Sequence, residues 1–288
     1  MNTKSSTHLS FDSPPSPNGD PHSVPIALTI AGSDPTSGAG IQADLKTFAA
    51  QNVYGLSVIT ATTAQNTMGV QAVYPVSHEV IERQCQTLIT DIPIRFIKTG
   101  MIYDSDSIRF IANFIVENNL VAVVDTPFMS SGGKALMEKA GMTAYLDVLI
   151  PRAEIITPNI MEAEMLSGCK ITSKDDVEQA AEVLISRGAK SVLIKGGHLD
   201  SSESPDYYKS KTESFWFDGL RIPMTHAHGT GCTLSAAICA NLALGNEMPE
   251  SIRNSKEYIT NALQDSFSIG EGRRILAHLP QYSLKEII

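Results

Sequence analysis

The sequence predicts an α/β protein with a mostly parallel central sheet and helices on both of its faces. From residue 25 onward, short apolar runs typical of buried strands alternate with longer amphipathic segments. Neither an internal repeat nor a linker-like composition divides this pattern. We therefore expect one domain over residues 25–288.

The strands are expected where apolar and β-branched residues are concentrated. In chain order these runs are residues 26–30, 56–60, 70–76, 96–98, 121–124, 154–157 and 191–195. Helical periodicity predicts helices at 40–51 and 78–90, helical segments between the later strands, and closing helices at roughly 229–245 and 249–268. Residues 205–224 place aromatic residues in a polar, alternating context, which predicts antiparallel hairpin strands at a sheet edge.

Residues 1–24 differ from the rest of the chain in composition. They are rich in Pro, Ser and Asp and show neither helical nor strand periodicity. We expect a disordered N-terminal extension, with a short docking arm as the alternative.

Composition argues against several classes of function. The formal net charge is -9 and no long basic run occurs, so neither a nucleic-acid nor an anionic membrane partner is expected. No apolar stretch approaches the roughly 20 residues needed to cross a bilayer, and the start of the chain lacks a signal-peptide pattern. The four cysteines form no CxxC pair, which favours reduced thiols in a cytoplasmic protein.

A glycine-containing loop at residues 31–40 follows the first expected strand. Glycines allow close approach to a ligand, and the next helix offers free backbone N–H groups. The loop matches neither a Walker A nor a GxGxxG pattern. A ligand-binding loop and a plain strand-to-helix turn both remain open.

The segment at residues 157–164 has the pattern of a helix start. Pro158 and Asn159 are typical of the first positions, and Glu162 follows Asn159 at a spacing that puts both on one side of the first turn. The two polar side chains either orient Mg²⁺ near nucleotide phosphates or form a helix cap with a solvated acid.

Lys195 stands at the end of a buried strand and precedes Gly196-Gly197-His198. A lysine in this position can reach into a site as a point charge. The alternative is a surface lysine in a turn.

The most informative segment runs from a glycine-containing loop into a helix of small apolar residues. In Gly229-Thr230-Gly231-Cys232 the backbone N–H groups crowd a helix N-terminus, which suits charge that develops on a transferred phosphoryl group. Cys232 is expected to have a lowered pKa there, whereas Cys239 is expected to be a structural cysteine. A buried structural role is the alternative for Cys232 as well.

At this segment the chain resembles the ribokinase-like vitamin kinases, in which Cys stands where other ribokinase relatives have Asp. The similarity is strongest to the bifunctional hydroxymethylpyrimidine and phosphomethylpyrimidine kinases of thiamine biosynthesis, and it spans about residues 26–270. It is carried by residues 29–34, 38–47, 60–61, 65–67, 100–101, 157–159, 195–198 and 229–232. The resemblance implies a ribokinase-like three-layer fold, ATP and Mg²⁺ as cofactors, a small pyrimidine alcohol as substrate and a homodimer.

The resemblance also implies roles for individual residues. Gln65 is expected to pair with the edge of the pyrimidine ring. The pocket walls are expected to be Gly32, Asp44, Met101 and Pro127. The magnesium and phosphate side is expected to contain Asp125, Asn159 and Glu162. The catalytic and nucleotide-phosphate group is expected to contain Lys195, Gly229, Thr230, Gly231 and Cys232, with Cys232 as the base that faces the substrate hydroxyl.

The chain departs from the family pattern in two segments near the site, and the second of them concerns substrate range. Ala227 stands where the family often has Thr, and residues 125–133 lack the Val-Met pair that commonly follows Asp125-Thr126. Pyridoxal kinase, which would use the same catalytic parts, is the alternative enzyme. A nucleotide-binding sensor without catalysis is the alternative class, although the intact set of Lys195, Glu162 and Cys232 argues against it.

Overall fold

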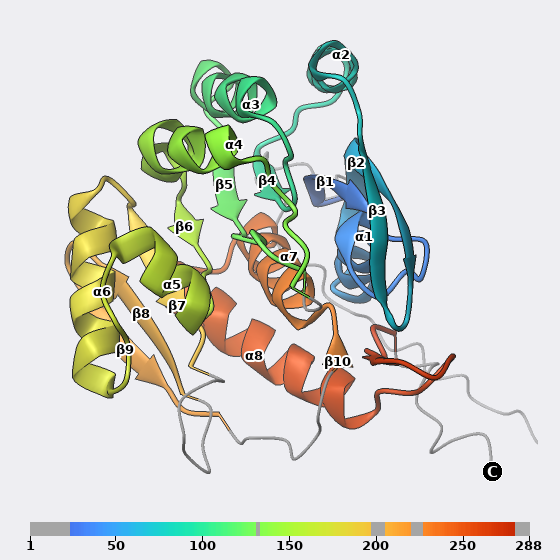
Figure 1. The fold of residues 1–288 in the computed structure, drawn as a ribbon. Coiled ribbons are helices and arrows are strands. Elements are labelled where there is room, and N and C mark those ends of the chain that lie inside the picture. Colours follow the sequence, from blue (N-terminus) through green and yellow to red (C-terminus); the bar gives the residue numbers. More distant parts are fainter. Residues whose placement is uncertain (1–23, 131–132, 197–204, 220–226, 280–288) are drawn as a thin grey trace, which may run out of the picture.

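The computed structural model describes residues 24–130, 133–196, 205–219 and 227–279. Its centre is a nine-stranded sheet with the order β3-β2-β1-β4-β5-β6-β7-β8-β9 (Figure 1). The strands from β2 to β7 in this order are parallel to one another. Their bounds are β1 Ile26–Ser33, β2 Tyr54–Asn66, β4 Phe96–Thr99, β5 Val121–Val124, β6 Ile155–Ile156 and β7 Ser191–Ile194. The predicted, mostly parallel sheet is confirmed.

Antiparallel strands close both edges of the sheet. At one edge β3 (Gly69–Pro75) folds back on β2, and at the other β8 (Asp206–Ser210) and β9 (Ser214–Phe217) follow β7. This confirms the edge hairpin predicted for residues 205–224, whose last part lies outside the described residues. A separate two-stranded sheet pairs β10 (Ala227–His228) with β11 (Arg274–Ile275).

Helices cover both faces of the sheet and form a three-layer structure (Figure 1). One face carries α1 (Gly40–Ala50), α7 (Thr230–Ala243) and α8 (Met248–Gln264). The other face carries α2 His78–Ile89, α3 Ser105–Glu117, α4 Lys139–Ala144, α5 Ile160–Ser167 and α6 Lys174–Ser186, together with the short helices η1 Tyr145–Leu149 and η2 Ile150–Arg152. The predicted three-layer arrangement is therefore confirmed.

The burial of β1 shows why its sequence is apolar without strict alternation. Leu28 and Ile30 pack into the core under α2 and α3, whereas Ala27 packs into the core under α1 and α7. Successive strand residues point to opposite faces, so a strand covered on both sides needs apolar residues at successive positions. Helix α7 is buried along most of its length because it lies between the sheet and α8.

The predicted N-terminal extension lies outside the described residues, apart from Val24. Among the described residues, no helix combines the length and the apolar character that a membrane span requires.

Candidate active site

The candidate site lies at the carboxyl ends of the parallel strands. The loops after β5, β6 and β7 carry Asp125, Asn159 and Lys195, and the N-terminus of α7 reaches the same edge. A methyl group placed on Gly231 would lie 3.2 Å from Nζ of Lys195 and 3.7 Å from Oδ2 of Asp125. In open α/β sheets this edge is where ligands bind.

The start of α7 requires a glycine and has no side-chain cap. Gly229, the N-cap residue, has a φ of 88°, a conformation that L side chains rarely adopt. A methyl group there would lie 1.8 Å from the carbonyl oxygen of Gly38, so the two glycine-containing loops are in direct contact. Because no side chain caps this helix start, its first N–H groups are suited to bind an anionic ligand.

Lys195 and Asp125 form the charged centre of the site. Nζ of Lys195 lies 3.4 Å from Oδ1 of Asp125, which also accepts a hydrogen bond of 3.1 Å from Oγ1 of Thr157. Burial favours the neutral carboxyl of Asp125, but Lys195 and Lys98 outweigh it and hold its pKa below the usual value. Burial likewise opposes the charge of Lys195, but Asp125 and Glu162 keep its pKa above the usual value. The site therefore holds both a carboxylate and an ammonium group.

Asn159 and Glu162 form a capping box at the start of α5. Oδ1 of Asn159 accepts the N–H of Glu162 at 2.9 Å, and Oε2 of Glu162 accepts the N–H of Asn159 at 2.8 Å. Oγ1 of Thr126 donates to the same Oε2 at 2.8 Å. Glu162 is partly buried, and burial raises its pKa. The cap itself is present.

The carboxylates fit a metal that is shared with a ligand. Asp125 lies in the loop after β5 and Glu162 in the first turn of α5, and Glu162 is close enough to Asp125 for their charges to interact. Within the described ranges, no group of three or more His, Cys, Asp or Glu side chains could hold a metal by itself. Mg²⁺ commonly takes one or two carboxylates and completes its shell with phosphate oxygens and water. This donor set suits Mg²⁺ that arrives with a nucleotide.

Cys232 lies in the first turn of α7, where its sulfur accepts the backbone N–H of Gly40. The expectation of a lowered pKa is wrong, because burial raises the pKa of this thiol to about 11. Lys98 favours the thiolate, but burial and the carboxylates of Asp125 and Asp44 outweigh it. Burial raises the pKa of Cys239 further still. Cys232 is therefore a neutral thiol at neutral pH.

Asp44 does not form the pocket wall that was expected, and this prediction is corrected. Its side chain is fully buried and lies 2.8 Å from Nζ of Lys98, which is also fully buried. Oγ1 of Thr29 donates to Oδ2 of Asp44 at 2.6 Å. Burial opposes the charge of Lys98, yet Asp44 holds the pKa of Lys98 above its usual value. Lys98 was not among the expected site residues, although a lysine in an apolar strand is a signal that a buried acid must accompany it.

The other expected pocket residues lie at or near the ends of β1, β2, β4 and β5. A methyl group on Gly32 would lie 3.2 Å from Sδ of Met101. Oγ1 of Thr60 donates a hydrogen bond of 2.5 Å to the carbonyl oxygen of Met101. Pro127 is partly buried in the loop after β5. Gln65, near the end of β2, has its Nε2 at 2.8 Å from Nε2 of His228. Because His228 directly precedes Gly229, the pocket side and the start of α7 adjoin.

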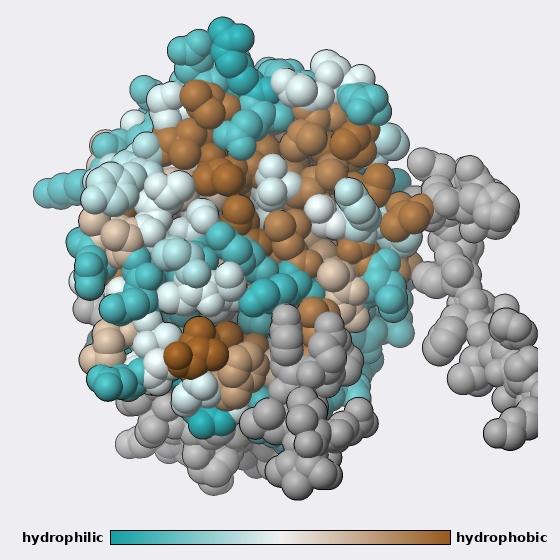
Figure 2. Space-filling view, turned by 90° about the vertical axis from the view of Figure 1, so that its right-hand side faces the viewer, coloured by the Kyte–Doolittle hydropathy of each residue, from teal (hydrophilic) through white to brown (hydrophobic). Residues whose placement is uncertain are grey.

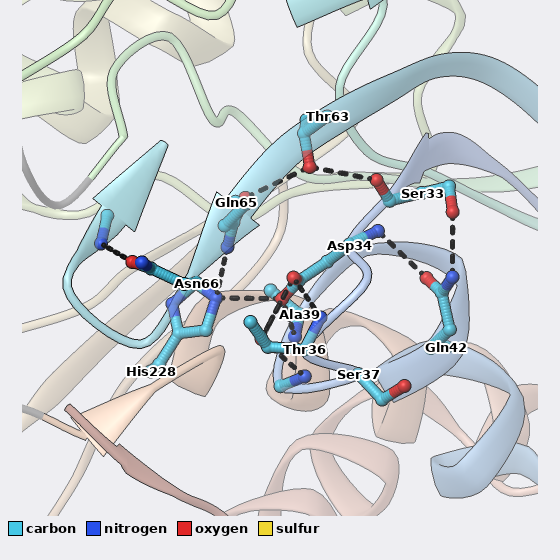
Figure 3. Close-up of polar contacts among 12 residues, drawn as sticks. Ser33, Asp34, Thr36, Ser37, Ala39, Gln42, Thr63, Gln65, Asn66 and His228 are labelled. Carbon is cyan, nitrogen blue, oxygen red and sulfur yellow. Dashed lines mark hydrogen bonds and ion pairs between the residues drawn. The ribbon is translucent and has the colours of Figure 1, made fainter. Parts of the chain in front are cut away.

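Asp34 lies in the glycine-containing loop at residues 31–40, and its partners could not be foreseen from the sequence (Figure 3). Its carboxylate accepts the backbone N–H groups of Thr36 at 2.8 Å and Ala39 at 2.9 Å, and Oδ2 lies 2.9 Å from Nε2 of His228. These bonds fold the loop between β1 and α1 around the acid. The loop is thereby held against the segment that leads into α7.

Comparisons with known proteins agree with this geometry. The profile of the family described as phosphomethylpyrimidine kinase matches residues 34–277. A hydroxymethylpyrimidine/phosphomethylpyrimidine kinase of Rhizobium meliloti is 42% identical over 261 residues, which cover 89% of this chain and 98% of the relative.

Two solved structures show the same fold. A phosphomethylpyrimidine kinase of Clostridium difficile is 44% identical, with a TM-score of 0.74 over 83% of this chain and 99% of that one. A pyridoxal kinase of Staphylococcus aureus, in complex with AMP-PCP and pyridoxal, is 32% identical, with a TM-score of 0.82 over 92% of this chain and 96% of that one. From the sheet, the uncapped start of α7 and these similarities, we conclude that the chain belongs to the phosphomethylpyrimidine kinase family.

Proposed function

We propose that the protein transfers the γ-phosphoryl group of ATP to the hydroxyl of 4-amino-5-hydroxymethyl-2-methylpyrimidine, and then phosphorylates the monophosphate to the pyrophosphate. The supporting observation is the position of Gly231, where an added methyl group would lie 3.2 Å from Nζ of Lys195. A helix start without a side chain and a cation that faces it are suited to a phosphoryl group in transfer.

The protein contributes chiefly by positioning and by stabilising charge. The N–H groups of Thr230, Gly231 and Cys232 at the start of α7 bind the oxygens of the transferred group, and Lys195 neutralises their charge. Asp125 and Glu162 hold Mg²⁺ together with the nucleotide phosphates, and Asn159 keeps Glu162 in place through the capping box. When bound, Mg²⁺ neutralises charge on the phosphates.

The pyrimidine lies on the side of Gln65, Gly32, Met101 and Pro127. An amide offers both a hydrogen-bond donor and an acceptor, which matches an aminopyrimidine edge. Cys232 faces the substrate hydroxyl, and its minor thiolate form accepts the hydroxyl proton. With a pKa of about 11, this form is scarce at neutral pH, so the base is more effective in alkaline solution.

Release of ADP in Mg²⁺ buffer tests the function with three acceptors in parallel. Hydroxymethylpyrimidine and its monophosphate should each stimulate ADP release well above the rate without acceptor. Pyridoxal, the substrate of the alternative enzyme, should stimulate it less. If neither pyrimidine stimulates ADP release by the folded protein, the proposal is wrong. A preference for pyridoxal would identify the protein as a pyridoxal kinase.

We propose that a second copy of the chain covers the face of β2 and β3. Figure 2 views the molecule from this side, and hydrophobic side chains gather over the upper and middle part of the face. On these strands and the turn between them, Met68 is 69% exposed, Tyr54 62% and Tyr74 60%, so large side chains are accessible to a second copy. A monomer in sedimentation velocity at micromolar concentration contradicts this assembly.

Residues 25–288 are proposed as the kinase domain of a cytoplasmic protein, with residues 1–24 as a dispensable extension. A chain that begins near residue 24 should keep the melting temperature and the turnover of the full chain. A loss of several degrees contradicts the extension.

A further inference from the structure

One nitrogen atom beside the proposed pyrimidine pocket faces two groups with opposite requirements (Figure 3). Nε2 of His228 lies 2.9 Å from Oδ2 of Asp34 and 2.8 Å from Nε2 of Gln65. The carboxylate oxygen needs a donor, whereas the amide nitrogen is itself a donor and needs an acceptor. A single ring nitrogen cannot serve both.

Asp34 decides which requirement His228 meets. Asp34 is 3% exposed, and its carboxylate already accepts backbone N–H groups from Thr36 and Ala39. Burial opposes the charge, but His228 and Thr36 outweigh it and lower the pKa of Asp34. An ionised carboxylate only accepts, so Nε2 of His228 carries a hydrogen and donates it to Asp34. This hydrogen leaves Nε2 without a lone pair for the amide N–H of Gln65.

A second conflict occurs at the other end of the same amide. Oγ1 of Thr63 lies 3.1 Å from the carbonyl oxygen of Ser33 and 3.2 Å from Oε1 of Gln65. Both neighbours are acceptors, and the hydroxyl has one hydrogen to donate. Thr63 therefore cannot satisfy both neighbours.

Turning the Gln65 amide by 180° resolves both conflicts together, because its oxygen and nitrogen exchange places. Oε1 of Gln65 then accepts from Nε2–H of His228, which it shares with Asp34. Nε2 of Gln65 donates to Oγ1 of Thr63, and the Thr63 hydroxyl donates to Ser33 alone. Nε2 of His228, the two amide atoms of Gln65 and the hydroxyl of Thr63 then each face a complementary partner. The order of donor and acceptor on Gln65 thus depends on His228.

We propose that Asp34 and His228 are positioning residues, which hold the Gln65 amide in one orientation and thereby select a 4-aminopyrimidine over its 4-oxo counterpart. The inference rests on the proposed function, in which Gln65 reads the ring edge. A 4-aminopyrimidine presents an amino donor beside a ring-nitrogen acceptor, and a 4-oxopyrimidine presents the reverse order. An amide held in one orientation can pair with the 4-aminopyrimidine edge. Against the 4-oxopyrimidine edge, the same amide faces donor with donor and acceptor with acceptor, which leaves these groups unpaired.

Calorimetric titration of the full chain with the 4-amino substrate and its 4-oxo analogue tests this selection. The wild type should prefer the amino compound roughly tenfold or more. His228→Leu removes the N–H, which frees the amide to turn, so the preference should fall to within about threefold while ATP affinity is retained. His228→Gln restores an N–H that can face Gln65 and should keep most of the preference. In a Gln65→Ala background, His228→Leu should have no further effect on either pyrimidine.

Nitrogen NMR of the His228 ring gives a readout that does not depend on activity. The proposal expects a hydrogen on Nε2 in the ligand-free wild type at neutral pH. An unprotonated Nε2 overturns it, as does an unchanged amino-to-oxo preference in folded His228→Leu. Equal losses for both pyrimidines and ATP in this variant also overturn it, because they indicate a purely structural role. If the wild type releases ADP with the pyrimidine but the binding or NMR results contradict the expectation, the positioning role is wrong and the proposed kinase function is unaffected. If the wild type neither binds nor phosphorylates the pyrimidine, both fall.

Discussion

Helices α5 and α7 both begin at the carboxyl ends of the parallel strands, but they differ in how their first N–H groups are capped. Helix α5 begins with a complete capping box, in which Asn159 and Glu162 satisfy each other's backbone N–H groups. Helix α7 begins at Gly229, and no side chain caps it. A helix start that is satisfied by its own side chains contributes stability, whereas an uncapped one is available to a ligand.

The two helix starts also differ in the groups that hold them in place. The acid of α5 is held by Thr126 and Asn159 and stays in place without a ligand. The start of α7 is instead held from outside, by the contact of Gly229 with the loop at Gly38. We therefore expect α5 to supply a fixed carboxylate and the start of α7 to bind an anion.

The largest expected effect follows from removing the sulfur in the first turn of α7. Cys232→Ser should lower turnover on the order of 10²–10⁴-fold, because a serine hydroxyl forms the anion far less readily than a thiol. Wild-type turnover should rise with pH below the thiol pKa of about 11. The variant should lose this rise, as measured by initial rates of ADP release. Intact turnover with a flat pH profile would show that the open helix start acts without a base.

The second effect distinguishes the two cysteines of α7. The thiolate is the nucleophile, so alkylation of Cys232 by iodoacetamide should speed up roughly tenfold per pH unit between pH 7 and 10. Cys239 is fully buried, with a pKa raised even further, and should react more slowly throughout. Peptide mass spectrometry measures both rates in one sample. Fast alkylation of Cys232 at pH 7 contradicts the raised pKa.

Next in size is the effect of adding a methyl group at the open start. Gly229→Ala combines a strained φ of 88° with a methyl group 1.8 Å from the carbonyl oxygen of Gly38. It should lower the free energy of unfolding by about 1–3 kcal/mol and reduce turnover as the loop shifts.

Gly245→Ala is the matched control for Gly229→Ala. Its φ of 90° imposes the same strain, but a methyl group there would meet nothing within 4 Å. Urea denaturation should show a smaller loss for Gly245→Ala, with turnover unchanged. Equal losses in both variants would mean that the contact with Gly38 contributes nothing.

The smallest effect is expected at the capped start. Asn159→Ala should lower the free energy of unfolding by about 1 kcal/mol, because it removes the cap of α5. It should also weaken ATP binding, since Glu162 loses its support. Ser173→Ala removes the equivalent capping box of α6 and should cost similar stability without affecting ATP. A loss of ATP affinity in Ser173→Ala would mean that capping acts through global stability.

Local spacing made part of the site predictable. Asn159 and Glu162 are three residues apart, so one helical turn brings them together wherever the helix lies. Gly229 could be recognised because a glycine before a helix of small residues is itself a local signal. The sequence could not show that a carbonyl 1.8 Å from the added methyl position also requires this glycine. That requirement comes from a loop almost 200 residues earlier.

The order of strands and helices, the antiparallel strands near residue 210 and the glycine-rich start of α7 could all be predicted from the sequence, because periodicity and turn chemistry act over a few residues. Three features depend on the folded structure: Lys98 pairs with Asp44, His228 contacts Asp34 across 194 positions, and the pKa of Cys232 is raised. Burial and charge are sums over neighbours in space, and these neighbours come from strands and loops that the fold alone brings together.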